Sequence, residues 1–108
     1  MITFEGDFDP DLKGSVIESL KEIYDPEIPV NIVDLGLIYR LAAEGQNIEV
    51  DMTLTSPGCP VAGEMPHWVG AAIANVEGVE HVKVNLVWEP QWGQGMMSEE
   101  ARLELGLF

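Results

Sequence analysis

The feature that most constrains the fold is a strand, helix, strand order between residues 48 and 88. Residues 48–55 alternate apolar and polar side chains, which is typical of a strand with one buried face. The apolar members are Ile48, Val50, Met52 and Leu54, and the polar ones are Glu49, Asp51, Thr53 and Thr55. Apolar residues then recur at helical spacing, at Met65, Trp68, Val69, Ala72, Ile73 and Val76. A second alternating stretch predicts a strand with Val82, Val84, Leu86 and Trp88 inward. Such a crossover makes two strands of one sheet parallel, with a right-handed connection.

A first helix is predicted between residues 10 and 24. Its apolar stripe consists of Leu12, Val16, Leu20, Ile23 and Tyr24. Asp9 can cap the helix, with Pro10 at its first position. Ser15 and Glu18 form an alternative capping box, because Gly14 weakens the first turn. Pro26 ends the helix near Tyr24.

An ordered loop and a hairpin are predicted next. Residues 25–36 contain two prolines and three acidic residues without a clear period, which indicates a loop. Residues 37–55 read as a hairpin that turns around Glu44, Gly45 and Gln46. The first strand of this hairpin alternates, with Leu37, Tyr39 and Leu41 on one face and Ile38, Arg40 and Ala42 on the other.

The sequence leaves open where the second helix begins and what role Trp92 has in the tail. The second helix begins either near Gly63, with Pro66 in its first turn, or at Pro60 with a bend at Pro66. The tail begins as a loop and ends in a short helix with Ser98 as its N-cap. Trp92 in that loop is either a partner anchor or a lid over the sheet, whereas Met96 and Met97 are expected to pack rather than bind metal.

These elements predict an α/β fold of the two-layer α+β type. The order is α-β-β-α-β, with a three-stranded mixed sheet, both helices on one face, and a C-terminal loop plus short helix. Residues 1–108 are expected to form a single domain, with residues 1–8 as a flexible tail.

Charge and cysteine content restrict the partners. The chain has five Lys and Arg residues and nineteen Asp and Glu residues, which gives a formal charge of −14. This charge repels phosphate backbones and anionic lipids, so neither nucleic acid nor membrane is an expected partner. A lone cysteine cannot pair within the chain and fits a reducing compartment. The acidic first ten residues have no long apolar run, and we expect a cytoplasmic protein.

The single cysteine, Cys59, stands between Pro57-Gly58 and Pro60, after a strand and before or at the start of a helix. A helix N-terminus favours a thiolate over a thiol and lowers the thiol pKa from about 8.5. Thr55 and Ser56 add hydroxyl donors nearby. A stiff loop that holds a sulfur at a helix start suits metal ligation or nucleophilic attack. The alternative is a buried structural cysteine; the proline and glycine frame favours the functional interpretation.

One thiolate limits the chemistry that the chain can perform. An iron–sulfur cluster usually takes four cysteines, so stable storage by one chain is not expected, whereas a homodimer brings two thiolates together. His67 and His81 are expected at the surface, too far from the cysteine to form a catalytic pair with it. The loop acids Asp25, Glu27 and Asp34 are further candidates, although their spacing alone favours helix termination and solvation.

Four segments in order resemble a known family. They are YDPEIPVNIVDLGLIY, DMTLTSPGCPVAGEMP, VKVNLVWEPQW and MMSEEARLELGLF. Together they are similar to the SUF-associated iron–sulfur assembly factors of the SufT and PaaD-like group, over most of the chain from about residue 15. The resemblance implies an α/β fold shared with NifU-type domains and a role in the maturation of iron–sulfur proteins. The Cys-x-x-Cys pair of NifU-type proteins is absent.

The resemblance also implies a site that combines the Asp-Pro-Glu loop with the Thr-x-x-x-Cys turn. At these positions the chain has Asp25 and Glu27, and Thr55, Ser56 and Cys59. The expected protein is a non-enzymatic accessory factor whose thiolate transiently contacts iron or a cluster. Its expected partners are the iron–sulfur assembly machinery and client apo-proteins.

Two other functions are compatible with the same residues. One is a thiol-dependent enzyme with Cys59 as nucleophile, and the other is a purely structural adaptor.

Overall fold

A computed structural model describes residues 2–6, 8–24, 30–54 and 64–106 of the chain. The main helices are α1 (Pro10–Leu20) and α2 (Met65–Ala74), and a short helix α3 (Glu99–Glu104) follows the 3-10 turn η1 (Gln94–Met96). The strands are β1 (Thr3–Gly6), β2 (Ile38–Glu44), β3 (Asn47–Met52) and β4 (His81–Leu86).

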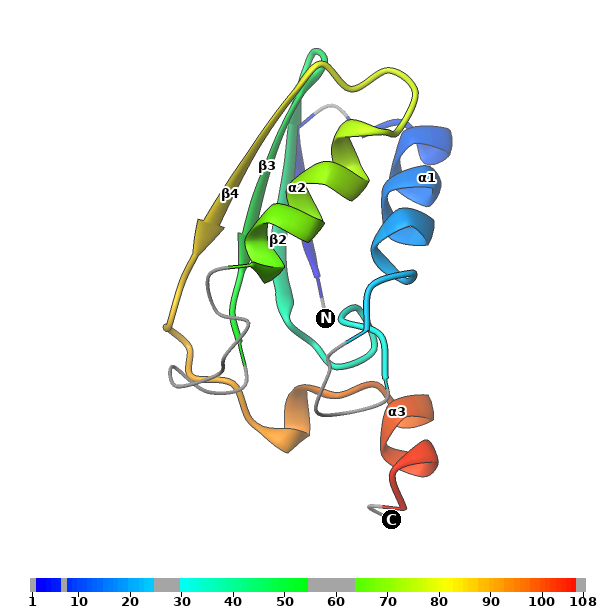
Figure 1. Ribbon diagram of the computed structural model, residues 1–108, viewed down its shortest axis with the longest axis vertical. Coiled ribbons are helices and arrows are strands. Elements are labelled where there is room, and N and C mark those ends of the chain that lie inside the picture. The colour runs from blue at the N-terminus through cyan, green and yellow to red at the C-terminus, as the bar shows by residue number, and fades with distance from the viewer. Residues whose placement is uncertain (1, 7, 25–29, 55–63, 107–108) are drawn as a thin grey trace.

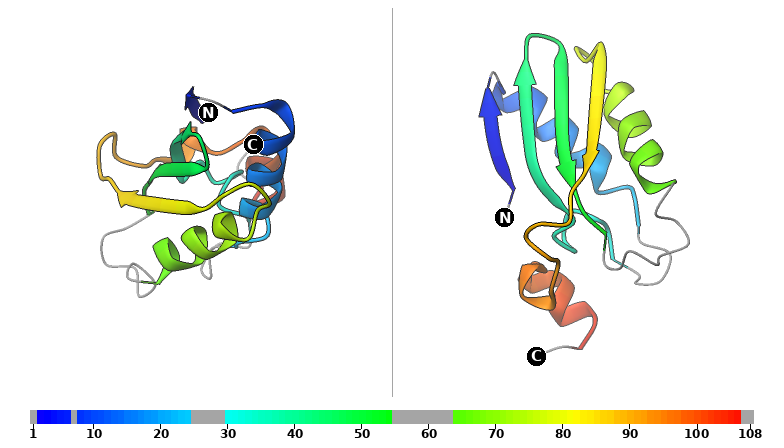
Figure 2. Two further views of the ribbon diagram at one scale, coloured as in Figure 1. Left: turned by 90° about the horizontal axis from the view of Figure 1, so that it is seen from above. Right: turned by 90° about the vertical axis from the view of Figure 1, so that its left-hand side faces the viewer.

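The four strands form one mixed sheet in the order β1-β2-β3-β4. The central pair is antiparallel, while β1 runs parallel to β2 and β4 runs parallel to β3. Both long helices pack on one face of this sheet (Figures 1 and 2). The predicted two-layer α+β class is confirmed, as is the parallel β3-α2-β4 crossover.

The predicted strand count was wrong by one, because β1 lies within the residues expected to form a flexible tail. Thr3 pairs with Arg40 and Gly6 with Ala43. Gly6 has a φ of 82°, and a side chain there would collide with the Ala43 carbonyl oxygen. Phe4 of β1 packs on the Phe8 ring, with centroids 5.5 Å apart, and carries the Lys13 ammonium over its face. These contacts anchor β1, although its four residues show no pattern that predicts a strand.

Helix α1 starts as predicted and ends earlier than predicted. The Asp9 side chain accepts a 2.8 Å hydrogen bond from Leu12 N–H, so Asp9 is the cap rather than Ser15. The helix stops at Leu20 instead of near Tyr24 because the chain there begins to pair with a later segment. Ile32 N–H donates to the Ile23 carbonyl, and Tyr24 forms an antiparallel bridge with Asn31.

The core fills the space between the sheet and the two helices. Its helical members include Val16, Leu20, Met65, Val69 and Ile73, all fully buried. Helix α2 begins at Met65 with Pro66 in its first turn, which decides between the two predicted starts. The segment 30–37 adds the buried residues Val30, Ile32, Leu35 and Leu37, so the described part of the predicted ordered loop is a core element.

A β-bulge changes the predicted faces of β2. The pairing register shifts between Ile38 and Arg40, so Tyr39 is the extra residue. Ile38, Leu41 and Ala43 are therefore buried, while Tyr39 does not share a face with Leu37 and Leu41 as its sequence position suggests. The Tyr39 hydroxyl instead donates to the Pro90 carbonyl oxygen at 2.7 Å and lies 3.3 Å from Met96 Sδ.

Three other residues differ from their predicted exposure. Thr53, predicted on the wet face of its strand, is fully buried beside Tyr39. Leu86 and Trp88, predicted inward, are 36% and 40% exposed. β4 is an edge strand that ends at Leu86, and Trp88 follows it, so both residues lie where the sheet ends. Val82 and Val84 pack against the core as predicted.

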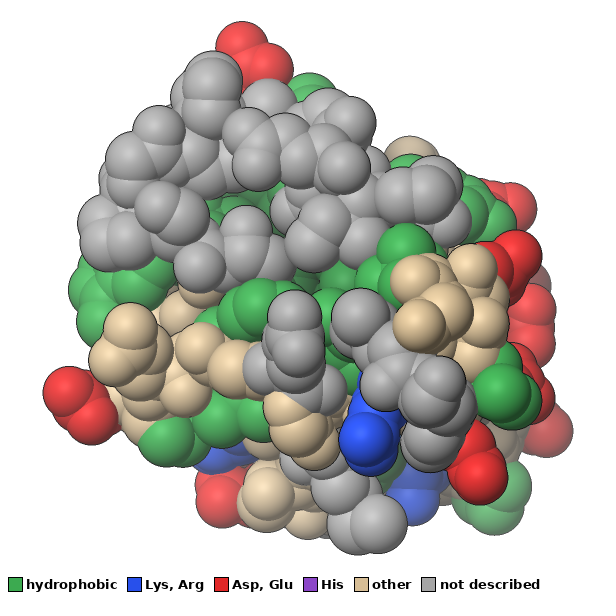
Figure 3. Space-filling model, turned by 90° about the horizontal axis from the view of Figure 1, so that it is seen from below, with side chains coloured by type: hydrophobic (Ala, Val, Ile, Leu, Met, Phe, Trp, Pro, Cys, Tyr) green, Lys and Arg blue, Asp and Glu red, His purple; other side chains and the backbone are tan. Residues whose placement is uncertain are grey.

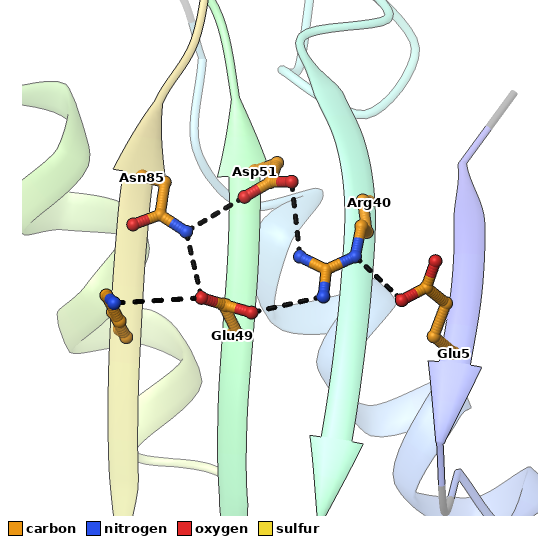
Figure 4. A network of polar contacts seen from close by, with 6 residues as sticks. Glu5, Arg40, Glu49, Asp51 and Asn85 are labelled. Carbon is orange, nitrogen blue, oxygen red and sulfur yellow. Dashed lines mark hydrogen bonds and ion pairs between the residues drawn. The ribbon is translucent and has the colours of Figure 1, made fainter.

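The outer face of the sheet carries a polar network that joins all four strands (Figure 4). Arg40 on β2 donates to Glu5 on β1 at 2.9 Å, and to Glu49 and Asp51 on β3 at 3.1 Å each. On β4, the Asn85 amide donates to Glu49 and Asp51. Three carboxylates thus share one guanidinium, in a chain in which acidic residues far outnumber basic ones.

We predict that Glu49→Gln weakens the acid sensitivity of the fold. Hydrogen bonds from Asn85 and Arg40 lower the Glu49 pKa below its usual 4.5. The folded state therefore keeps Glu49 ionised at pH values where the unfolded state protonates it, and this stabilisation is lost as pH falls through the folded pKa. Urea unfolding at a series of pH values should show lower stability of the variant at neutral pH and a smaller loss on acidification. An exposed control, Glu80→Gln, should follow the wild type, and an unchanged profile for Glu49→Gln would refute the prediction.

Candidate functional site

The predicted site residues fall in two segments, 25–29 and 55–63, that lie outside the described residues. Asp25 and Glu27 belong to the first segment, and Thr55, Ser56 and Cys59 to the second. Their mutual placement stays a prediction. The residues that flank the two segments are described, and they define the frame from which both segments depart.

The frame of the first segment is a set of backbone hydrogen bonds. The chain leaves at Tyr24 and returns at Val30, and the bridge between Tyr24 and Asn31 fixes both ends together. Next to it, Ile32 N–H donates to the Ile23 carbonyl at 2.9 Å. The departure and return points of residues 25–29 are therefore tied to each other.

Asp34, the third candidate acid, has a structural role in this frame. Its carboxylate accepts a 2.7 Å hydrogen bond from the Asn31 amide, and its N–H donates to Asn31 Oδ1 at 2.9 Å. Its carbonyl accepts from Ser98 N–H at 2.7 Å, which joins the segment to the start of α3. These bonds shape the turn in which Asn31 and Asp34 lie.

The frame of the second segment shares residues with the first. β3 ends at Met52, and Thr53 N–H donates to the Leu37 carbonyl at 2.8 Å. Leu37 N–H in turn donates to the Ile32 carbonyl at 3.1 Å. One chain of backbone hydrogen bonds thus runs from Ile23 through Ile32 and Leu37 to Thr53. The end of α1, the end of β3 and the start of α2 lie at the same end of the molecule (Figures 1 and 2).

The start of helix α2 affects the prediction that Cys59 is a thiolate. Because the helix begins at Met65, Cys59 precedes it by six residues and is not part of its first turn. The effect of a helix dipole falls off within the first turn. Activation of the thiol by the helix N-terminus therefore stays a prediction.

The two histidines are exposed, as the sequence predicts. His67 is exposed in the first turns of α2, and His81 is exposed at the start of β4, beside the hairpin. Across residues 2–6, 8–24, 30–54 and 64–106, no three His, Cys, Asp or Glu side chains are grouped to hold a metal ion. In the same ranges no helix is long and apolar enough to cross a membrane.

Trp92 closes the core from the C-terminal side. Its indole Nε1–H donates to the Leu35 carbonyl at 2.7 Å, and its ring packs against the core. This favours the lid over the partner anchor as its role.

Met97 is buried and Met96 contacts Tyr39, so the expectation that both methionines pack is confirmed.

Trp68 is a surface residue that the sequence pattern misassigned. Helical spacing places it on the inward stripe of α2, yet it is 39% exposed while Met65, Val69 and Ile73 are fully buried. It stands at the margin of the stripe, where spacing alone does not separate core from surface. A large aromatic residue at a stripe margin is the signal that marks it as a candidate contact residue.

The comparisons with known proteins decide the family. A family model described as iron–sulfur cluster assembly protein matches residues 13–86. The chain belongs to this iron–sulfur cluster assembly protein family. An Fe–S protein maturation auxiliary factor of Porphyromonas gingivalis is 50% identical over 93 residues, which cover 84% of this chain and 88% of that relative. The factor of that description from Staphylococcus aureus, SufT, is 38% identical over 79% of this chain and 98% of its own length.

Other relatives are longer. An iron–sulfur cluster carrier protein of Mycobacterium leprae is 35% identical to 88% of this chain, and the match covers 23% of that protein. Among solved structures, a DUF59 domain from Bacillus anthracis superposes with a TM-score of 0.82 at 38% identity, covering 91% of this chain and 94% of that one. Similar segments therefore make up nearly the whole of some relatives and about a quarter of a longer carrier.

We predict that Trp92→Phe destabilises the fold. The phenyl ring keeps most of the packing but cannot donate to the Leu35 carbonyl, which leaves a core acceptor unsatisfied. The free energy of unfolding should fall by about 1–3 kcal/mol, measured by urea denaturation. Trp88→Phe is the matched control, because Trp88 is 40% exposed and should change stability by no more than about 0.5 kcal/mol. Equal stability of the two variants would rule out the lid.

Proposed function

We propose that this chain is an accessory factor for iron–sulfur cluster assembly or transfer to client proteins, acting through the single thiolate of Cys59. Family membership and the maturation factors and cluster carriers among its relatives support the general role. The thiolate mechanism is supported by the frame: the residues on both sides of the Asp25–Glu27 segment and the end of β3, which precedes the Cys59 segment, belong to one hydrogen-bonded unit. The chain enters both segments from this unit, at one end of the sheet.

The proposed chemistry is transient iron ligation. Thiolate is a soft ligand that suits iron–sulfur clusters, whereas carboxylate is a harder ligand. A set with Cys59 as the only protein sulfur, aided by Asp25 or Glu27, binds a cluster more weakly than four thiolates and therefore releases it readily. Thr55 and Ser56 supply hydroxyls that orient the loop or donate to the sulfur.

Several further properties follow from this proposal. The chain is not an enzyme, since its role ends with delivery, and it holds no cluster stably. It works with the assembly machinery and client apo-proteins, in a cytoplasm that keeps the thiol reduced. The carriers in which a similar segment is part of a longer chain support a partnership between this domain and a cluster carrier. A homodimer, which places two thiolates at one cluster, is one arrangement that would allow bridging.

We predict that Cys59→Ser leaves the fold intact and lowers the activity of iron–sulfur enzymes in cells. The hydroxyl of serine occupies similar space but is a poor iron ligand at neutral pH. The measurement is the specific activity of iron–sulfur enzymes in extracts of a strain that carries the variant, with circular dichroism of the purified protein to verify folding. Glu27→Gln should lower activity less, since the sulfur remains. Normal enzyme activities in the Cys59→Ser strain would remove the thiolate mechanism.

The thiol-dependent enzyme makes a different prediction. It requires fast alkylation of Cys59 with a thiol pKa well below about 8.5, and covalent trapping of a substrate analogue. We expect no covalent adduct with a substrate analogue, and a trapped adduct would favour the enzyme.

A further inference from the structure

β4 forms one long edge of the sheet, and among the described residues no strand lies beyond it (Figure 2). Val87 N–H donates to the carbonyl of Met52, which is aligned with Leu86. Successive residues of a strand turn their backbone groups to opposite sides, so the odd-numbered residues of β4 bond to β3 and the even-numbered ones face away from it. The backbone groups at the free edge therefore belong to three apolar residues, Val82, Val84 and Leu86.

The side chains of these three residues lie on the inner face of the sheet, but they are less covered than those of the next strand. They are aligned, in that order, with Ile48, Val50 and Met52 of β3. The three β3 residues are at most 2% exposed, whereas the two valines are partly exposed and Leu86 is 36% exposed. An edge that combines free backbone groups with a partly open apolar row is a template for an additional strand.

The elements at this edge differ from the rest of the chain in charge. Neither the ten residues of α2 nor the six of β4 include Asp or Glu, whereas every other α-helix and strand of the described residues has at least one. The end view shows the same difference, with more Asp and Glu side chains on the side of α1 and α3 than on the side of β4 (Figure 3).

The outer face of β4 carries a cation at its centre. His81, Lys83 and Asn85 point to this face, and the Lys83 side chain is 74% exposed, with its ammonium 3.9 Å from Glu49. Opposite charges on neighbouring strands stabilise their pairing, and like charges destabilise it. An acidic side chain on an added strand would therefore meet a lysine rather than a carboxylate on β4.

The position of α2 favours a single extended segment over a second copy of the chain. α2 packs on β4 at Gly70, where a Cβ would lie 3.5 Å from Val84 Cγ2, and it lies toward the free side of the sheet (Figure 2). Pairing two copies through β4 would place two such helices over strands about 4.8 Å apart, whereas packed helices need about 8–10 Å. An extended segment brings no helix of its own.

We propose that the free edge of β4 binds an extended segment of a partner protein as a fifth strand of the sheet. The backbone of this segment bonds to Val82, Val84 and Leu86, and its side chains alternate between the two faces. Apolar side chains continue the inner face beside Val84, and an acidic side chain lies on the outer face against Lys83. The inference does not use Cys59: it concerns which proteins the chain holds and not how it contacts iron.

The test is selection of a displayed library of random peptides, each of about ten residues, on the purified chain. We expect enriched peptides in which apolar residues alternate with Asp or Glu. Val84→Pro should weaken the binding of an enriched peptide by about tenfold or more, because proline removes an N–H at the free edge and no bond to β3. Val84→Ala is the matched control, since it shortens the same side chain and keeps the N–H, and its affinity should stay within about fivefold of the wild type.

A charge reversal tests the same edge without a change to its backbone, and it decides the matter if Val84→Pro does not fold. Lys83→Glu should weaken an enriched acidic peptide by about fivefold, and a peptide with Lys in place of its acidic residue should regain the affinity. Cys59→Ser should leave peptide binding unchanged, and circular dichroism verifies that each variant is folded. Failure to enrich alternating peptides, equal affinities of folded Val84→Pro and Val84→Ala, no effect of Lys83→Glu, or a stable dimer of the free chain joined through β4 would overturn the proposal and leave the thiolate function standing.

Discussion

A short run of backbone hydrogen bonds at one end of the sheet holds the chain from which both candidate segments begin. The N–H groups of Ile32, Leu37 and Thr53 donate hydrogen bonds to the carbonyls of Ile23, Ile32 and Leu37, in that order. The end of the first helix and the end of β3 are therefore held in one unit. The fully buried side chains of Ile32 and Leu37 protect these bonds from water. The frame is thus part of the core, and the two segments that carry the predicted site residues begin from a rigid base.

The proposed role is weak and transient iron ligation by a single thiolate. A chain with one cysteine cannot rival a four-thiolate client for a cluster, which is a property suited to delivery. The outer face of the sheet serves a different purpose, since its carboxylates are engaged by Arg40 and Asn85 and stabilise the fold.

Sequence periodicity predicted the order of the main elements because each has one buried face. Met65, Val69 and Ile73 on the second helix, and Ile48, Val50 and Met52 on β3, are buried as spacing requires. β1 escaped prediction because four residues are too short to show a period, and the bulge at Tyr39 escaped because an extra residue leaves no mark in composition. Trp68 and Trp88 were assigned inward because spacing reports a residue's direction and not whether anything covers it. The site residues stay a prediction from the sequence, and the structure describes the segments that flank them.

The central claim is that the Asp25–Glu27 segment and the Cys59 segment form one site, and an engineered disulfide tests it most directly. The chain has a single natural cysteine, so Glu27→Cys creates one defined intramolecular pair. A disulfide requires Cα atoms within about 7 Å. We predict that mild oxidation of the dilute monomer yields an intramolecular disulfide, while a Glu44→Cys control retains two free thiols. Free thiols or only intermolecular dimers from Glu27→Cys would contradict the account.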